Sequence, residues 1–153
     1  MKKIIIIILF TIPLNCKSQN IVDLNTLTLN NIEFLGKSKS FLFSNLGQAI
    51  NYEVIKSEMD NKNMCIYKYN GANFIIVDDI VDSFEINNSN FSFTSSNIKI
   101  GDNIDTLKTI YPLSFDNKSS KHLSIQIMDT DMYVSFHYNS INKLITLIRI
   151  GTY

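Results

Sequence analysis

Apolar and polar residues alternate with a period of two through much of the C-terminal half of the chain. The apolar positions are Leu123, Ile125 and Ile127 in one stretch and Met132, Val134, Phe136 and Tyr138 in the next. A period of two with one apolar face is typical of strands with one buried and one solvated side. Residues 144–150 are apolar on both faces apart from Thr146 and Arg149, which predicts a central or covered strand.

The N-terminal half has a similar order of elements. A glycine at Gly36 or Gly101 precedes a short amphipathic segment, and three strand-like stretches follow each segment. The predicted strands are 64–69, 73–77 and 80–86 in the first half and 122–128, 132–138 and 144–150 in the second. This shared order predicts a duplicated unit.

Helix-capping and turn-forming residues mark the ends of the expected helices and the positions of the turns. Ser38 is placed to cap a helix that ends at Gly47, and Asp102 is placed to cap a helix that ends before Pro112. Asn70-Gly71 predicts a hairpin turn with positive φ at both positions, and Asp78-Asp79 predicts another turn.

These elements predict an α+β fold of two tandem helix-plus-antiparallel-sheet units that form one continuous or adjoining curved sheet. The expected divisions are a signal peptide at 1–15, a tether at 16–25, a first repeat at 26–90 and a second repeat at 91–153. Residues 26–29 and 91–93 are each expected to form a further strand or an ordered link.

The first fifteen residues have the pattern of an export signal, with Lys2 and Lys3 before an apolar stretch at 4–14. That stretch reaches only about 16 Å as a helix, whereas the hydrocarbon core is about 30 Å thick. Two cleavage sites remain open. Cleavage before Cys16 gives a lipidated cysteine and a membrane anchor in the bacterial envelope, and cleavage after Ser18 gives a periplasmic or secreted protein.

The charge of the chain bears on its binding partners, and its cysteine content bears on disulfide formation. Removal of residues 1–15 takes two of the 14 basic residues and none of the 14 acidic ones, so the remainder carries no basic footprint for nucleic acid. The chain has two cysteines, Cys16 and Cys65. Both cleavage routes leave Cys65 without a partner, so we expect no intramolecular disulfide and a Cys65 that packs as a small apolar side chain.

Residues 100–112, Ile-Gly-Asp-Asn-Ile-Asp-Thr-Leu-Lys-Thr-Ile-Tyr-Pro, combine a glycine, a short helix and a proline. This segment resembles the signature of the small lipoprotein of the outer-membrane barrel-assembly machinery and of the β-lactamase inhibitory protein family. The resemblance implies a doubled helix-plus-sheet unit in one curved sheet. It departs from that pattern at Gly47, which stands where the first unit would have its proline.

The sequence contains no phosphate-binding loop, no histidine pair at metal-ligand spacing and no nucleophile elbow. His122 and His137 are expected on strands as polar surface residues, and the Asp78-Asp79 and Asp129/Asp131 clusters are expected in turns. We therefore expect no catalytic residue, metal or cofactor.

The expected function is a non-catalytic protein-binding or inhibitory module of an envelope lipoprotein. The alternatives are a structural accessory of envelope assembly and a small periplasmic enzyme. Tyrosine and arginine are frequent interface anchors. The candidate partner-binding residues on the polar sheet face are Gln126, Tyr133, His137 and Arg149.

Overall fold

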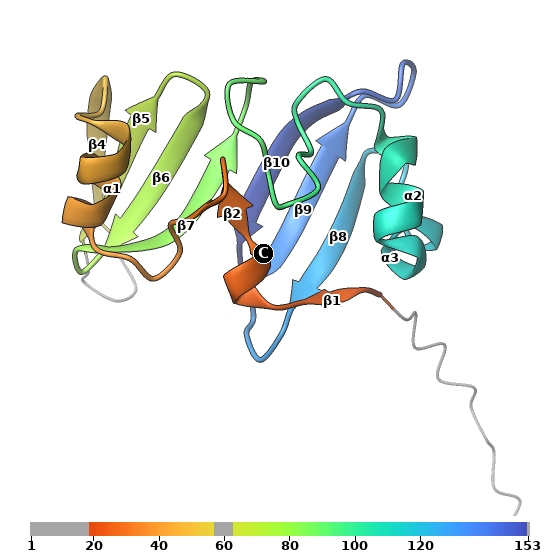
Figure 1. Cartoon of the computed structure of the whole chain (residues 1–153), viewed down its shortest axis with the longest axis horizontal. Coiled ribbons are helices and arrows are strands. Elements are labelled where there is room, and N and C mark those ends of the chain that lie inside the picture. The colour runs from red at the N-terminus through yellow and green to blue at the C-terminus, as the bar shows by residue number, and fades with distance from the viewer. Residues whose placement is uncertain (1–18, 57–62, 153) are drawn as a thin grey trace, which may run out of the picture.

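The structure is a computed structural model that describes residues 19–56 and 63–152. Within these residues, eight strands form one mixed sheet in the order β1-β8-β9-β10-β7-β6-β5-β4 (Figure 1). The strands are β1 (Ile21–Val22), β4 (Asn51–Lys56), β5 (Asn63–Tyr69), β6 (Ala72–Val77), β7 (Ile80–Ile86), β8 (His122–Ile127), β9 (Tyr133–Tyr138) and β10 (Ile145–Gly151). The predicted α+β class is confirmed, with all of these strands in a single sheet.

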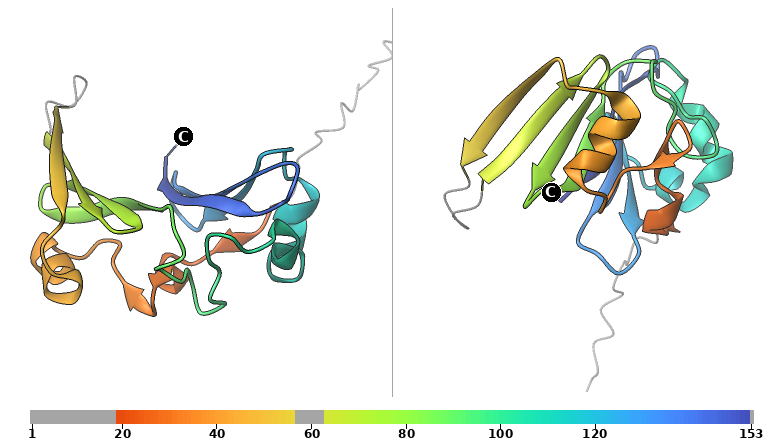
Figure 2. Two further views of the ribbon diagram at one scale, coloured as in Figure 1. Left: turned by 90° about the horizontal axis from the view of Figure 1, so that it is seen from above. Right: turned by 60° about the vertical axis from the view of Figure 1, so that its left-hand side comes forward.

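The remaining elements lie together on one side of this sheet, as the left-hand view of Figure 2 shows. They include a small hairpin that pairs Leu29 with Ile32 and a long link at 87–103. The helices and hairpin strands are η1 (Leu24–Thr26), β2 (Thr28–Leu29), β3 (Ile32–Glu33), α1 (Lys39–Leu46), η2 (Ile104–Thr106), α2 (Leu107–Ile110) and α3 (Pro112–Asp116).

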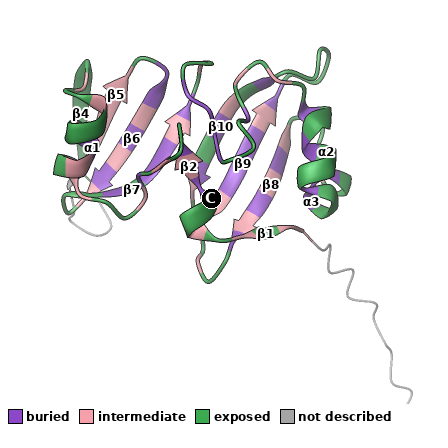
Figure 3. Ribbon diagram, viewed as in Figure 1, coloured by how far each residue is buried: buried purple, intermediate pink, exposed green. Residues whose placement is uncertain are grey.

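The strands follow the hydrophobic pattern of the sequence. Along β8 each residue at an odd position is buried and each neighbour is half-buried, and Figure 3 shows the same striping on β6. β10 lies between β9 and β7, in agreement with its prediction as a central strand. The three C-terminal strands and β7 begin and end within one or two residues of their expected positions.

The two predicted turns differ in backbone conformation. Asp78 and Asp79 both have positive φ, which suits the twist of the β6–β7 hairpin and which Asp tolerates better than most residues. At Asn70-Gly71 only Gly71 has positive φ, so the expectation for Asn70 is wrong although the turn is in the expected place.

The helix of the first half is confirmed, whereas that of the second half is more divided than expected. Ser38 accepts a hydrogen bond from the Phe41 backbone and Gly47 ends α1 with φ 75°. In the second half Asn103, and not Asp102, caps η2 by accepting from the Asp105 backbone. As expected, the helix ends before Pro112, since α2 stops at Ile110 and Tyr111 has a non-helical φ of −131°. Pro112 then begins the short helix α3, because proline is well suited to a first helical turn.

Two strands were missed at the sheet edges. β4 was expected as part of a link, and all six of its residues are exposed, so it lacks an alternating burial pattern. β1 lies inside the range expected as a tether. Its Ile21 and Val22 pair in parallel with Gln126 and Ile127, which places this part of residues 16–25 in the sheet.

A line of aromatic rings runs through the core from one half of the chain to the other. Successive ring centroids lie 5.3 to 6.4 Å apart along the series Phe34, Phe74, Phe84, Phe93, Phe136 and Tyr111. Phe93 is fully buried at the middle of this line. It lies in the 87–103 link and forms isolated β-bridges with Leu29 and with Ile98. The core is therefore continuous across the two halves.

Cys65 is half-buried on β5 as a free thiol, with Ile76 and Val54 as its neighbours on the adjacent strands. Across residues 19–56 and 63–152, no helix combines the length and apolar character that a bilayer crossing requires. Cys16 and the signal segment 1–15 lie outside the described residues.

Phe93→Ala tests whether the central aromatic residue links the two halves. We expect the free energy of unfolding to fall by about 3 to 5 kcal/mol, because the substitution opens a cavity between Phe84 and Phe136. Urea denaturation followed by circular dichroism measures this loss, and the wild-type protein should unfold in one transition. Ile141→Ala is the control, because Ile141 is 92% exposed. An unchanged midpoint for Phe93→Ala, or two separate wild-type transitions, would contradict the prediction.

Candidate functional site

One face of the eight-stranded sheet carries no covering element among the described residues (Figure 2). The helices, the β2–β3 hairpin and the 87–103 link all pack on the opposite face, where they enclose the hydrophobic core. We call the uncovered side the bare face. Its residues alternate with the core-facing residues along β8, β9, β10, β7, β6 and β5, and their strand register places them in rows across the sheet. Among them Ser83 and Ser135 are buried.

A polar row crosses the centre of the bare face. The row runs along paired positions from one strand to the next and consists of Ser124, Ser135, Arg149, Glu85, Asn73 and Lys68. A neighbouring row is mixed in character and consists of Gln126, Tyr133, Gly151, Ser83, Ile75 and Ile66. Polar, aromatic and apolar groups are therefore combined on one open surface.

A hollow of about 240 Å³ lies where these rows pass over β9 and β10. It is lined by Tyr133, Ser135, His137, Arg149, Gly151 and Thr152. The hollow exists because Gly151 has no side chain beside Tyr133, its partner on β9. A Cβ atom at position 151 would meet only the Ser83 Cβ, at an ordinary contact distance of 3.9 Å, so the space there is open.

The charges around the hollow are partly balanced. The Arg149 Nε lies 3.3 Å from the Glu85 Oε1, across the β10–β7 pair, and the Arg149 side chain remains 51% exposed. A half-exposed pair of this kind contributes little to stability and leaves the guanidinium N–H groups oriented toward solvent or a ligand. Arg149 is thus positioned by Glu85 and accessible at the same time.

His137 and His122 are direct partners on β9 and β8, and their ring centroids lie 6.2 Å apart. Burial lowers the pKa of His137 below its ordinary value of 6.5, and the positive charges of His122 and Arg149 lower it further. Glu85 acts in the opposite direction. His137 therefore favours its neutral form, in which one ring nitrogen donates and the other accepts a hydrogen bond.

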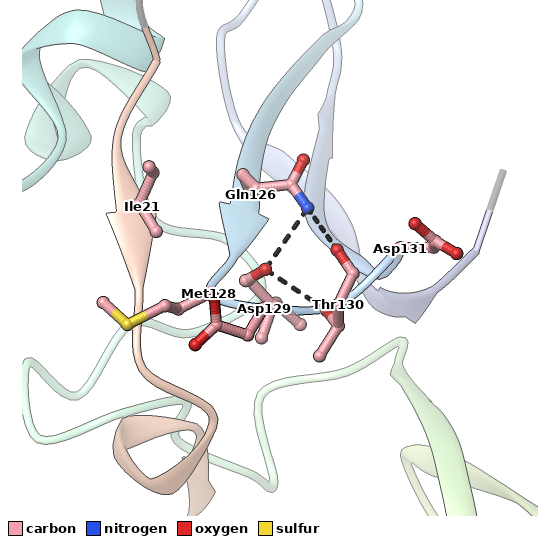
Figure 4. A pocket seen from close by; sticks show the side chains of 7 residues that line it. Ile21, Gln126, Met128, Asp129, Thr130 and Asp131 are labelled. Atoms are coloured by element: carbon pink, nitrogen blue, oxygen red, sulfur yellow. Dashed lines mark hydrogen bonds between the residues drawn. The ribbon is translucent and has the colours of Figure 1, made fainter.

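Gln126 does not line this hollow, although it pairs with Tyr133. Its Nε2 donates to the Thr130 carbonyl oxygen at 2.7 Å and to the Ile127 carbonyl oxygen at 3.2 Å. Figure 4 shows the amide directed toward the β8–β9 turn, beside a separate pocket of about 370 Å³ that Ile21 and Asp131 also line. The position of Gln126 thus favours a role in holding the turn.

The structure also locates the other polar residues that the sequence analysis considered. Asp129 and Asp131 lie in the β8–β9 turn and Asp78-Asp79 in the β6–β7 turn, as expected. The His122 Nδ1 lies 2.7 Å from the Ser119 Oγ, but that oxygen accepts hydrogen bonds from the backbones of Lys121 and His122 and so belongs to a turn. Within the described ranges, no three His, Cys, Asp or Glu side chains gather as a metal site would require.

Tyr133, His137 and Arg149, three of the four candidate residues, therefore line one hollow. Gly151 and Ser135 also line the hollow, and Glu85 forms an ion pair with Arg149, but none of these three residues was among the candidates. Residues 144–150 are largely apolar on both faces, so no alternation placed Gly151 opposite the core, and nothing local in the sequence showed that β7 and β10 are neighbours.

No protein-family model matches the chain, and no curated protein matches it. Two solved structures have a similar fold. One is an extracellular protein containing a SCP domain from Bacillus anthracis str. Ames, with a TM-score of 0.50 and 10% identity. The other is a cysteine-rich secretory protein from Staphylococcus aureus subsp. aureus Mu50, with a TM-score of 0.47 and 15% identity. Each match covers 78% of this chain and 44% of the other, so this chain spans less than half the length of either protein.

The first of these structures corrects the resemblance drawn from residues 100–112. With a TM-score of 0.50, it is a protein containing a SCP domain, and not the barrel-assembly lipoprotein or the β-lactamase inhibitory protein, so that assignment is wrong. The physical reason is the small extent of the motif. The motif of glycine, short helix and proline covers only η2, α2 and the start of α3. Short motifs of this kind occur in unrelated folds.

The lowered pKa of His137 predicts a pH dependence of stability. The unfolded chain binds a proton at His137 more readily than the folded protein does, so the free energy of unfolding should fall as pH drops below about 6.5. Urea denaturation of the wild-type protein and of His137→Gln at about pH 7.5 and about pH 5.5 measures this, and the variant should lose less stability at low pH. In an NMR titration, His122→Gln should raise the pKa of His137. A His137 pKa above 6.5 in the wild-type protein would contradict the prediction.

Proposed function

We propose that the chain is an exported, non-catalytic binding module that docks a protein partner on the bare face of its sheet. The observation that carries the proposal is the hollow bounded by Tyr133, His137 and Arg149 on that uncovered surface. Tyrosine and arginine are frequent at the energetic centres of protein interfaces, and here an imidazole lines the same hollow.

The mixed character of the bare face favours a protein over a small hydrophobic ligand. Half-buried Ile66 and Ile75 supply apolar area beside the polar row, and Arg149 and Glu85 supply directional charges at its centre. Protein interfaces combine an apolar centre with polar groups in this way. The strands below the hollow are rigidly paired on both sides, so binding would require little reordering of the backbone.

Export is supported by the signal-like first fifteen residues and by the extracellular nature of the Bacillus anthracis protein with a similar fold. The finer proposal is an anchor at Cys16. Asn20 and Ser114 exchange hydrogen bonds of 2.9 and 3.0 Å, so the chain is attached to α3 from Asn20 onward. Cys16 lies four residues before Asn20, and four residues span at most about 14 Å. A lipid on Cys16 would therefore hold the β1–β8 edge of the sheet close to the membrane surface.

We also propose that the sheet derives from two tandem units, with boundaries near residues 26–90 and 91–153. The strand order supports this, because β5-β6-β7 and β8-β9-β10 are both antiparallel meanders and meet through their last strands. The segments expected to correspond before each helix, 26–29 and 91–93, meet at the Leu29–Phe93 bridge.

Gly151→Val tests the docking surface. Valine suits a strand, and its Cβ would meet only the Ser83 Cβ, at 3.9 Å, so we expect the fold to be retained while the side chain fills the hollow. A photo-cross-linking residue at exposed Thr152 should yield a covalent adduct with a partner in intact cells, and Gly151→Val should reduce that adduct at least about tenfold, because filling the hollow costs the partner its central contact.

Two controls define the interpretation of this experiment. Thr146→Val introduces the same side chain on β10 outside the hollow and should leave the adduct unchanged. The same cross-linker at exposed Lys108 on α2, on the covered side of the sheet, should give no such adduct. Equal adducts from positions 152 and 108, or no effect of Gly151→Val, would reject the bare face as the docking surface.

Cys16→Ser tests the anchor. The wild-type protein extracted from membranes should carry the added mass of a diacylglycerol and a fatty acid, and Cys16→Ser should lack it and move to the soluble fraction. Intact-mass spectrometry and fractionation measure both effects. A wild-type chain that begins at Gln19 and carries no lipid would show cleavage after Ser18 and would refute the lipid anchor.

A further inference from the structure

The outer strand β4 presents an unusually apolar edge. All six of its residues are exposed, and four of the large apolar side chains that the described residues expose lie together at positions 50–55. These are Ile50 at 75%, Tyr52 at 61%, Val54 at 58% and Ile55 at 41% exposure. An edge strand also presents unpaired backbone N–H and C=O groups, which makes it a template for another strand.

Apart from the charged side chains of Glu53 and Lys56, β4 lacks the features that usually prevent edge pairing. It contains no proline or glycine, and its register with β5 runs without a bulge from Asn51–Lys68 to Lys56–Asn63. The carboxylate of Glu53 already forms an ion pair with Lys68 on the neighbouring strand. The other edge of the sheet is different, because β1 has only two residues and is too short for extensive pairing. β4 is thus the edge suited to a partner strand.

The aromatic side chains at this edge are held in position before any pairing occurs. Tyr52 stacks on Tyr67 with ring centroids 5.7 Å apart and an interplanar angle of 20°, and Tyr67 packs edge-on against Phe43 of α1 at 5.3 Å. Because Tyr52 is already ordered, a partner strand that contacts it incurs a smaller loss of side-chain entropy.

A second copy of the chain can pair with this edge in a register that opposes no like charges. A two-fold axis perpendicular to the sheet keeps each face on its own side, so residues of one face must oppose residues of the same face. Centring the axis on Glu53 would place two carboxylates opposite each other. Centring it on Val54 pairs Val54 with itself, Glu53 with Ile55 and Tyr52 with Lys56, with no like charges opposed.

We propose that two copies of this chain associate through antiparallel pairing of β4 with β4, centred on Val54, so that the two sheets become continuous. The paired segment extends from Tyr52 to Lys56 in each copy. It buries the apolar side chains of the edge and satisfies its outward backbone groups. This interface is at the edge of the sheet and does not depend on the bare face as a docking surface. Its small size predicts a dissociation constant in the micromolar range.

Analytical ultracentrifugation of the processed wild-type protein from about 10 to about 300 µM tests the association. The measured mass should rise toward twice that of the monomer. Val54→Lys places two ammonium groups at the axis and removes apolar contact, so it should raise the dissociation constant at least about tenfold. Ile141→Lys makes the same change at a 92% exposed position in another part of the chain and should have no effect. Circular dichroism checks that both variants are folded.

Cysteine cross-linking tests the register. Cys65 is the β5 partner of Val54, so the experiment uses a Cys65→Ala background to prevent an intramolecular disulfide. Val54→Cys should then form a covalent dimer under mild oxidation, since directly opposed residues lie within disulfide reach. Tyr52→Cys should not, because its counterpart would lie about 13 Å along the strand. In the ultracentrifuge, a monomer at every concentration would overturn the proposal and leave the edge for a strand of a different protein. In the cross-linking experiment, efficient cross-linking of Tyr52→Cys but not of Val54→Cys would overturn the register.

Discussion

The pairing of β7 with β10 is the constraint on which the rest of this structure depends. It places Ile86 beside Ile148 and Phe84 beside Ile150, and so it joins two three-stranded meanders into one sheet with a continuous core. Without this pairing, each meander would have another open edge and a smaller apolar interior. The fully buried Phe84 and Phe93 lie at this junction and extend the contact into the layer of helices and links.

The same register creates the candidate site. Arg149 lies beside Glu85 because the two final strands are antiparallel and in this alignment, and Gly151 lies beside Ser83 for the same reason. Small residues at the junction leave a hollow, and larger polar residues on β9 surround it. A shift of one residue in the β7–β10 register would put Arg149 and Glu85 on opposite faces of the sheet and one set of core residues on the bare face, so the site and the core are specified together.

The two edges of the sheet have different properties. The β1 edge is short and lies near the segment that leads to Cys16, whereas the β4 edge is longer and apolar. Seven strand spacings separate them, which is about 34 Å. An anchor at one edge would therefore leave the other edge and the bare face accessible, so membrane attachment, partner binding and self-association would use separate parts of one sheet.

The sequence by itself determined the local elements whose signals are short in range. Alternation defined β8 and β9 and placed Tyr133 and His137 on the polar face. An apolar stretch defined β10, and Ser38 and Gly47 delimited α1. Only the tertiary structure decided which strands are neighbours, because strand pairing depends on contacts between residues far apart in the chain, such as Glu85 and Arg149. For the same reason the hollow at Gly151 and the edge strands β1 and β4 became visible only in the folded sheet. A glycine or an exposed strand carries no local pattern that identifies the residue opposite it.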